Sequence, residues 1–112
     1  MDRFDSILLR IKERPGVYLG KPSLKRLSAF LGGYLICMHD ITKDRTIDFY
    51  PGFQDYIQQR YRITSTQGWD KIIDFFCIKD EEAFYRFFEH LDEFLEQQGK
   101  PKLGEENQLP PD

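Results

Sequence analysis

Four side chains in this 112-residue sequence are of types that could carry chemistry, namely Cys37, His39, Cys77 and His90. Two thiolates and two imidazoles suit zinc, and a cysteine beside a histidine suits nucleophilic catalysis. Their spacing fits no compact zinc-finger pattern, and nothing in the sequence brings a thiol within hydrogen-bond reach of an imidazole. We therefore expect no metal, no cofactor and no enzymatic activity, and we interpret the cysteines as reduced, small hydrophobic residues.

The segment ERPGVYLG, residues 13–20, is the candidate for nucleotide binding. It resembles the RPGMYIG segment of the DNA gyrase B and related ATPases, which precedes a helix with a catalytic glutamate and a magnesium-binding asparagine. When the segment SLKRLSAFLGGY is aligned with that helix by its leucines, the glutamate and asparagine positions fall on Phe30 and Tyr34. Their rings neither activate water nor supply the carboxylate or amide oxygens that magnesium prefers. We interpret the segment instead as a helix stop: Pro15 fixes φ, Gly16 takes a left-handed turn, and VYLG forms a short extended piece.

The charge is strongly segregated along the chain. Residues 1–79 carry a formal charge of +4 and residues 80–96 carry −6, within a total of −3. The basic residues Lys21, Lys25, Arg26, Arg60 and Arg62 are dispersed, and the calculated pI is about 5.4. An acidic block favours a basic protein partner over nucleic acid, so we expect no nucleic-acid binding.

The acidic block coincides with the clearest helical pattern, DEEAFYRFFEHLDEFLEQ, which begins at Asp80 as the expected N-cap. A helical wheel divides it into an apolar half and a polar half. The apolar half contains Ala83, Phe84, Phe87, Phe88, Leu91, Phe94 and Leu95. From the polar half we select as partner-binding residues Glu82, Tyr85, Glu89, Asp92, Glu93 and Glu96.

Four further helices are needed to bury that apolar half. Apolar spacing predicts the first from Phe4 to Ile11, capped by Asp2. Ser23 caps the second, whose apolar face runs from Leu24 to Met38 and whose Gly32-Gly33 pair suggests close packing of another backbone. The third begins near Phe53 after the loop 40–52, and the fourth runs from Trp69 to about residues 77–79.

The predicted fold class is mainly α. Residues 1–97 form a single compact domain of about five helices with one or two short extended segments, followed by a disordered tail, 98–112, that is rich in Pro, Gly and charge. No stretch is long and apolar enough to cross a membrane, and the charged amino terminus is unlike a secretory signal. We expect a cytoplasmic protein that makes no membrane contact.

The order of these segments supports a second resemblance, which spans most of residues 14–95. RPGVYLGKPSLKRLSAFLGGY, FQDYIQQRY, GWDKIIDFF and DEEAFYRFFEHLDEFL look like small bacterial immunity proteins of contact-dependent growth inhibition and related polymorphic toxin systems. The resemblance implies a cytoplasmic protein that binds and neutralises a cognate toxin domain, often a nuclease. The alternative is a small adaptor or regulatory module with no toxin partner, and exposed aromatic residues would also suit a homodimer.

Overall fold

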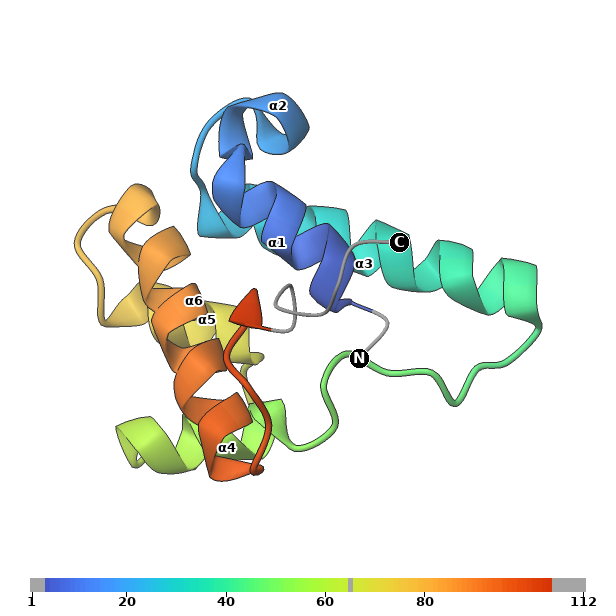
Figure 1. Ribbon diagram of the computed structural model, residues 1–112. Coiled ribbons are helices and arrows are strands. Elements are labelled where there is room, and N and C mark those ends of the chain that lie inside the picture. Colours follow the sequence, from blue (N-terminus) through green and yellow to red (C-terminus); the bar gives the residue numbers. More distant parts are fainter. Residues whose placement is uncertain (1–3, 65, 106–112) are drawn as a thin grey trace.

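The computed structural model describes residues 4–64 and 66–105 (Figure 1). Within those residues the chain forms six helices and no strand, so the predicted mainly α fold is confirmed, with one more helix than expected and without the extended segments. The helices are α1 (Asp5–Glu13), α2 (Pro15–Leu19), α3 (Leu24–Thr42), α4 (Phe53–Tyr61), α5 (Trp69–Phe75) and α6 (Asp80–Gln97). The predicted cap Asp2 lies outside the described residues.

The additional helix is α2, where the sequence predicted an extended piece. Pro15 occupies the first turn of this helix, a position at which a missing backbone N–H costs nothing. The left-handed residue is Gly20, with φ of 84°, and not Gly16 as expected. The left-handed backbone at this position favours glycine, and the Arg26 guanidinium beside it donates a hydrogen bond to the Leu19 carbonyl at 2.7 Å. The first helix does end just before Pro15, as predicted, and Gly20 ends the additional short helix that follows.

Helix α3 is tied to α6 at its first turn. The Ser23 side chain caps α3 as predicted, accepting a hydrogen bond from the Arg26 backbone N–H at 3.1 Å. The Ser23 hydroxyl and the Lys25 N–H both donate to the carboxylate of Asp80. Asp80 was expected to be the N-cap of α6, but its carboxylate instead accepts hydrogen bonds from the first turn of α3. Burial alone would raise the pKa of Asp80, but these hydrogen bonds lower it.

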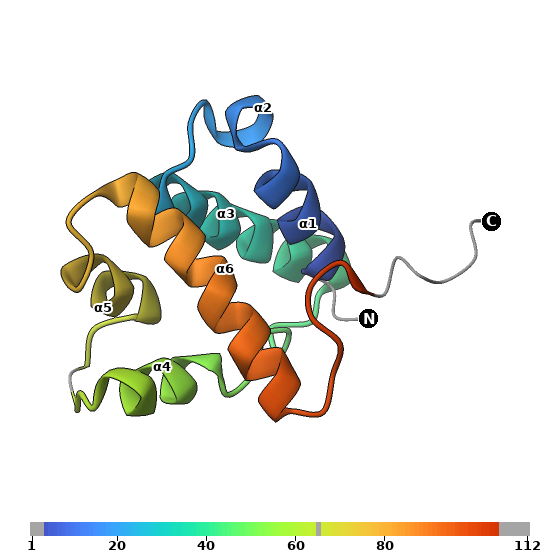
Figure 2. The same cartoon turned by 60° about the vertical axis from the view of Figure 1, so that its left-hand side comes forward.

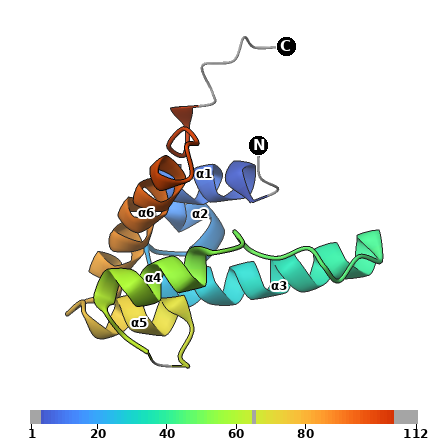
Figure 3. The same ribbon diagram turned by 90° about the horizontal axis from the view of Figure 1, so that it is seen from below.

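The second half of α3 extends beyond the other helices (Figure 3). Ile36 and Ile41 are exposed there, and the helix continues to Thr42, into the segment expected to be a loop. The prediction that Gly32 and Gly33 allow another backbone to pack closely is wrong, because a Cβ at either position would meet nothing within 4 Å. Both glycines therefore face open space.

The core is built around α6, which crosses the molecule with α4 and α5 along one side and α1 along the other (Figure 2). All seven apolar positions predicted for its inner half are buried, and His90 is buried with them. The Phe87 ring stacks on Trp69 of α5 at 4.9 Å between centroids, and it meets Phe53 of α4 edge-on at 5.7 Å. Aromatic pairing thus joins the three carboxy-terminal helices into one core.

The chain after α6 folds back along that helix. The Leu103 N–H donates to Asp92 at 2.9 Å, Lys102 lies 3.2 Å from Glu96, and the Leu103 side chain packs against the core. These contacts join residues 98–105 to the folded domain, and the remainder of the predicted tail, 106–112, lies outside the described residues. No described helix has the length and apolar character needed to cross a membrane.

The central position of Phe87 leads to the first prediction. Phe87→Ala should lower the free energy of unfolding by about 3–5 kcal/mol, because the change removes a fully buried ring and leaves a cavity between α4, α5 and α6. Urea denaturation followed by circular dichroism measures the loss. Phe75→Ala, at a ring that is 77% exposed, is the matched control and should change stability by less than about 0.5 kcal/mol. Equal effects of the two substitutions would contradict this account of the core.

Candidate functional site

The six predicted partner-binding residues divide into two groups along α6. Glu82, Tyr85 and Glu89 are exposed and share one stripe at i, i+3 and i+7 spacing. Asp92, Glu93 and Glu96 are instead engaged by groups of this chain, Asp92 and Glu96 by the folded-back segment 98–105. We call Glu82, Tyr85 and Glu89 the outer stripe. Glu89 pairs with Arg86 of the same helix at 3.2 Å, and both side chains stay exposed at the surface.

Glu93 is the acceptor at the centre of a polar network between α4 and α6. Its Oε1 accepts from the Tyr56 hydroxyl at 2.7 Å, from Nδ1 of His90 at 3.1 Å and from Nε of Arg60 at 3.3 Å. Burial opposes ionisation of Glu93, but the hydrogen bonds from Tyr56 and His90 lower its pKa. Burial and the Glu93 carboxylate in turn raise the pKa of Tyr56 to about 12. The network joins two helices, and its carboxylate is not presented to a partner.

The buried His90 completes this network and has a defined tautomer. Because an ionised Glu93 can only accept, Nδ1 of His90 carries the proton, and Nε2 of the neutral ring accepts from the Tyr61 hydroxyl at 2.6 Å. Burial lowers the pKa of His90 and favours this neutral form. The imidazole is therefore satisfied on both nitrogens, which is the arrangement of a structural histidine.

The sequence reasoning missed an exposed apolar cluster between α5 and α6. Phe75, Phe76 and Ile78 are 77%, 49% and 95% exposed, and the first two rings lie 5.1 Å apart. We call these three residues the hydrophobic corner. Helix α5 ends at Phe75, two to four residues earlier than expected, so Phe76 and Ile78 lie beyond the end of the helix. The sequence offered no clear signal for this, because adjacent apolar pairs such as Phe87 and Phe88 on α6 are both buried.

The corner and the outer stripe are adjoining surfaces. Glu82 of the stripe accepts the backbone N–H of Ile78 in the corner at 3.2 Å. Phe76 stacks on Tyr61 at 4.7 Å, which supports the corner from α4. Between residues 70 and 89 there are six acidic and three basic side chains, so the apolar cluster lies in an acidic segment. We call the corner and stripe together the candidate binding surface.

The remaining candidates for chemistry do not converge on one site. Cys37 is exposed on α3, while Nε2 of His39 lies 2.7 Å from the Ile47 carbonyl oxygen. Burial and the neighbouring Glu82 raise the pKa of Cys77, which keeps this thiol protonated. In the part of the chain that the structure describes, no three His, Cys, Asp or Glu side chains are grouped to hold a metal ion.

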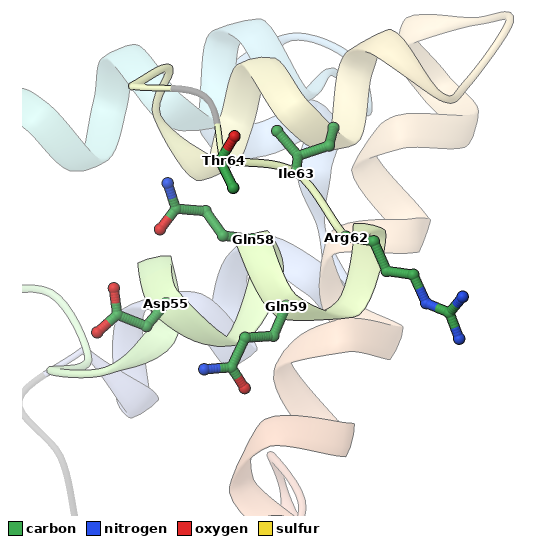
Figure 4. Close-up of a pocket in the computed structure, with 6 residues that line it drawn as sticks. All are labelled: Asp55, Gln58, Gln59, Arg62, Ile63 and Thr64. Atoms are coloured by element: carbon green, nitrogen blue, oxygen red, sulfur yellow. The ribbon is translucent and has the colours of Figure 1, made fainter.

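A polar pocket of about 360 Å³ lies along α4 and the turn after it (Figure 4). Its side chains point in different directions: Asp55 and Arg62 lie near opposite ends of the helix, and Arg62 points away from the pocket centre. Catalysis needs a nucleophile or base aimed at a common point with its partners, which this arrangement lacks. The lining residues are Asp55, Gln58, Gln59, Arg62, Ile63 and Thr64.

No family model, no curated protein and no solved structure matches this chain. Its function must therefore be argued from its own surface. The feature that most needs a functional explanation is the hydrophobic corner, because neighbouring apolar side chains left in water are unfavourable unless something covers them.

The state of His90 gives a prediction of pH dependence. Its pKa in the folded protein lies below the ordinary 6.5, so the unfolded chain binds the proton more readily. The contribution of neutral His90 to the free energy of unfolding is therefore fully present above pH 6.5. It should be lost as the pH falls below that value, before the more acidic range in which Glu93 titrates. Urea denaturation between about pH 5 and pH 8 measures this slope. The slope should flatten in His90→Gln and persist in His39→Gln, and an unchanged slope in His90→Gln would contradict the assignment.

The two cysteines should differ in reactivity. Cys37 is exposed, whereas Cys77 is half-buried and its pKa is raised. At about pH 8 we expect Ellman's reagent to modify Cys37 at least about tenfold faster than Cys77, because the thiolate is the reactive form. The single variants Cys37→Ser and Cys77→Ser assign the two phases. A faster reaction at Cys77 would mean that this thiol is activated, and it would reopen the catalytic interpretation.

Proposed function

We propose that this protein is an immunity protein that binds and neutralises a basic toxin domain, in particular a nuclease, through the candidate binding surface. The observation that carries the proposal is the exposed hydrophobic corner beside an acidic stripe. Protein-protein interfaces commonly combine a desolvated aromatic centre with a polar rim. Phe75, Phe76 and Ile78 would form that centre, with Tyr85 as a further anchor.

The charge supports a basic partner. A nuclease attracts phosphate with a basic surface, and an inhibitor that presents carboxylates is attracted to the same surface. Glu82 and Glu89 would speed encounter with such a toxin, while burial of the corner would slow dissociation. We further propose that the complex forms in the cytoplasm, where a nuclease toxin reaches its nucleic-acid substrate.

The direct test is calorimetric titration against a candidate toxin domain taken from the neighbouring reading frame, with its activity assayed in parallel. Tight one-to-one binding that abolishes activity is expected. No binding at micromolar concentrations would reject this partner and favour the alternative of an adaptor for another cellular protein.

The hydrophobic corner can be tested with one matched pair of variants. Ile78→Asp should weaken toxin binding at least about tenfold, because a charge would replace an apolar contact at the interface centre. Ile41→Asp is the control: Ile41 is similarly exposed, at 76%, but lies near the end of α3. Both changes are on the surface and should leave the circular dichroism spectrum unaltered. Equal affinities of the two variants would remove the corner from the interface.

The outer stripe requires a separate test based on charge. The double reversal Glu82→Lys with Glu89→Lys should reduce the association rate, and the reduction should shrink as salt is added. The control is Glu13→Lys with Asp40→Lys, which changes the net charge by the same amount at exposed positions on α1 and α3, away from the outer stripe, and should slow association less. Stopped-flow or surface-plasmon kinetics distinguish a local effect from a global one. Glu93 is unsuitable for this test, because its replacement would break the network with Tyr56 and His90.

A further inference from the structure

A small pocket lies between α3, α5 and the segment that precedes α4, apart from the polar pocket of α4 and from the hydrophobic corner. Its volume is about 200 Å³. Pockets for drug-sized ligands and cofactors usually measure about 300–1,000 Å³, so this pocket is of a size for one side chain. Its lining residues are Ser28, Leu31, Gly32, Leu35, Phe49, Trp69 and Asp70.

The pocket combines an apolar wall with a single acid. Leu31 and Leu35 come from α3, and the Phe49 ring stacks on Trp69 at 5.3 Å. Asp70 is the only charged residue among those that line it. Oδ2 of Asp70 accepts from the Ser28 hydroxyl at 2.8 Å, which fixes the carboxylate while leaving it further acceptor capacity.

Gly32 keeps the pocket open. Gly32 lies in the middle of a 19-residue helix, and a Cβ added there would meet nothing within 4 Å. Close packing therefore does not explain why this position lacks a side chain. A glycine there weakens the helix relative to alanine. The open space beside Gly32 is part of the pocket and is large enough to admit a group from outside the chain.

We propose that this pocket receives an arginine side chain of the partner. The aliphatic stem of arginine matches the apolar wall, and its planar, weakly hydrated guanidinium suits a carboxylate beside aromatic rings. This inference rests on the proposed function, in which the partner is basic. Trp69, which lines the pocket, and Phe75 of the hydrophobic corner are the first and last residues of α5, about 9 Å apart along the helix axis. One partner can therefore cover both the pocket and the corner.

The test uses the capped peptide Gly-Ser-Arg-Ser-Gly as the probe, with citrulline and lysine versions as controls. Trp69 is the only tryptophan in the chain, so its fluorescence and its indole NMR signal report directly on the pocket. We expect saturable shifts of the Trp69 and Gly32 signals with the arginine peptide. The citrulline and lysine peptides should bind at least about tenfold more weakly. Absence of shifts, or equal binding of either control peptide, would overturn the proposal.

Two adjacent glycines provide the matched variants. Gly32→Leu should fill the pocket and abolish arginine-peptide binding, whereas Gly33→Leu, at an equally open position outside the lining, should leave binding unchanged. Both variants should melt no lower than the original protein, because leucine favours the helix. Asp70→Asn, which keeps an acceptor for Ser28 but removes the charge, should weaken peptide binding at least about tenfold. Full binding by Gly32→Leu would overturn the proposal.

Titration of the toxin domain with the same variants separates this inference from the proposed function. A toxin bound normally by Gly32→Leu but poorly by Ile78→Asp would uphold the immunity function and reject the pocket. Arginine-peptide binding with no toxin binding would uphold the pocket and reject that toxin as the partner.

Discussion

The fold depends on burial of the aromatic inner face of α6. Phe84, Phe87, Phe88 and Phe94 provide an apolar stripe along 18 residues that no isolated helix can hide from water. Helices α3, α4 and α5 pack against it, and Phe53 and Trp69 meet Phe87 at its centre. The short helices α4 and α5 are too short to be stable alone, so their conformation follows from this packing.

Polar groups determine how the helices are held around that stripe. Asp80 receives hydrogen bonds from the first turn of α3, and Glu93 receives them from Tyr56 and Arg60 of α4. Buried or half-buried carboxylates need such donors, since an unpaired charge away from water is costly. Asp80, expected to cap its own helix, and Glu93, expected to face a partner, therefore act as connections between helices. The acidic character of α6 is only partly available for binding.

The same packing leaves one surface uncovered. Helix α5 ends early, and the side chains of Phe75, Phe76 and Ile78 remain largely exposed although Phe76 stacks on Tyr61 of α4. An apolar cluster beside the exposed acids of the outer stripe favours association with a basic protein, because carboxylates attract it and apolar burial retains it. The opening beside Gly32 at the other end of α5 extends this surface and adds a specific acid to it. Binding, and not catalysis, is the function that this combination favours.

The sequence by itself determined the helical class, the inner face of α6 and the cap at Ser23, because these depend on periodicity and local hydrogen bonding. It did not determine that PGVYL is helical, since five residues carry no usable period. It also treated six residues of α6 as one binding face. Only the tertiary structure divided them, because Glu93 bonds Tyr56 of α4, and Asp92 and Glu96 bond Leu103 and Lys102 of the segment that folds back after α6. Long-range contacts of this kind decide which polar residues remain for a partner, and no helical wheel contains them.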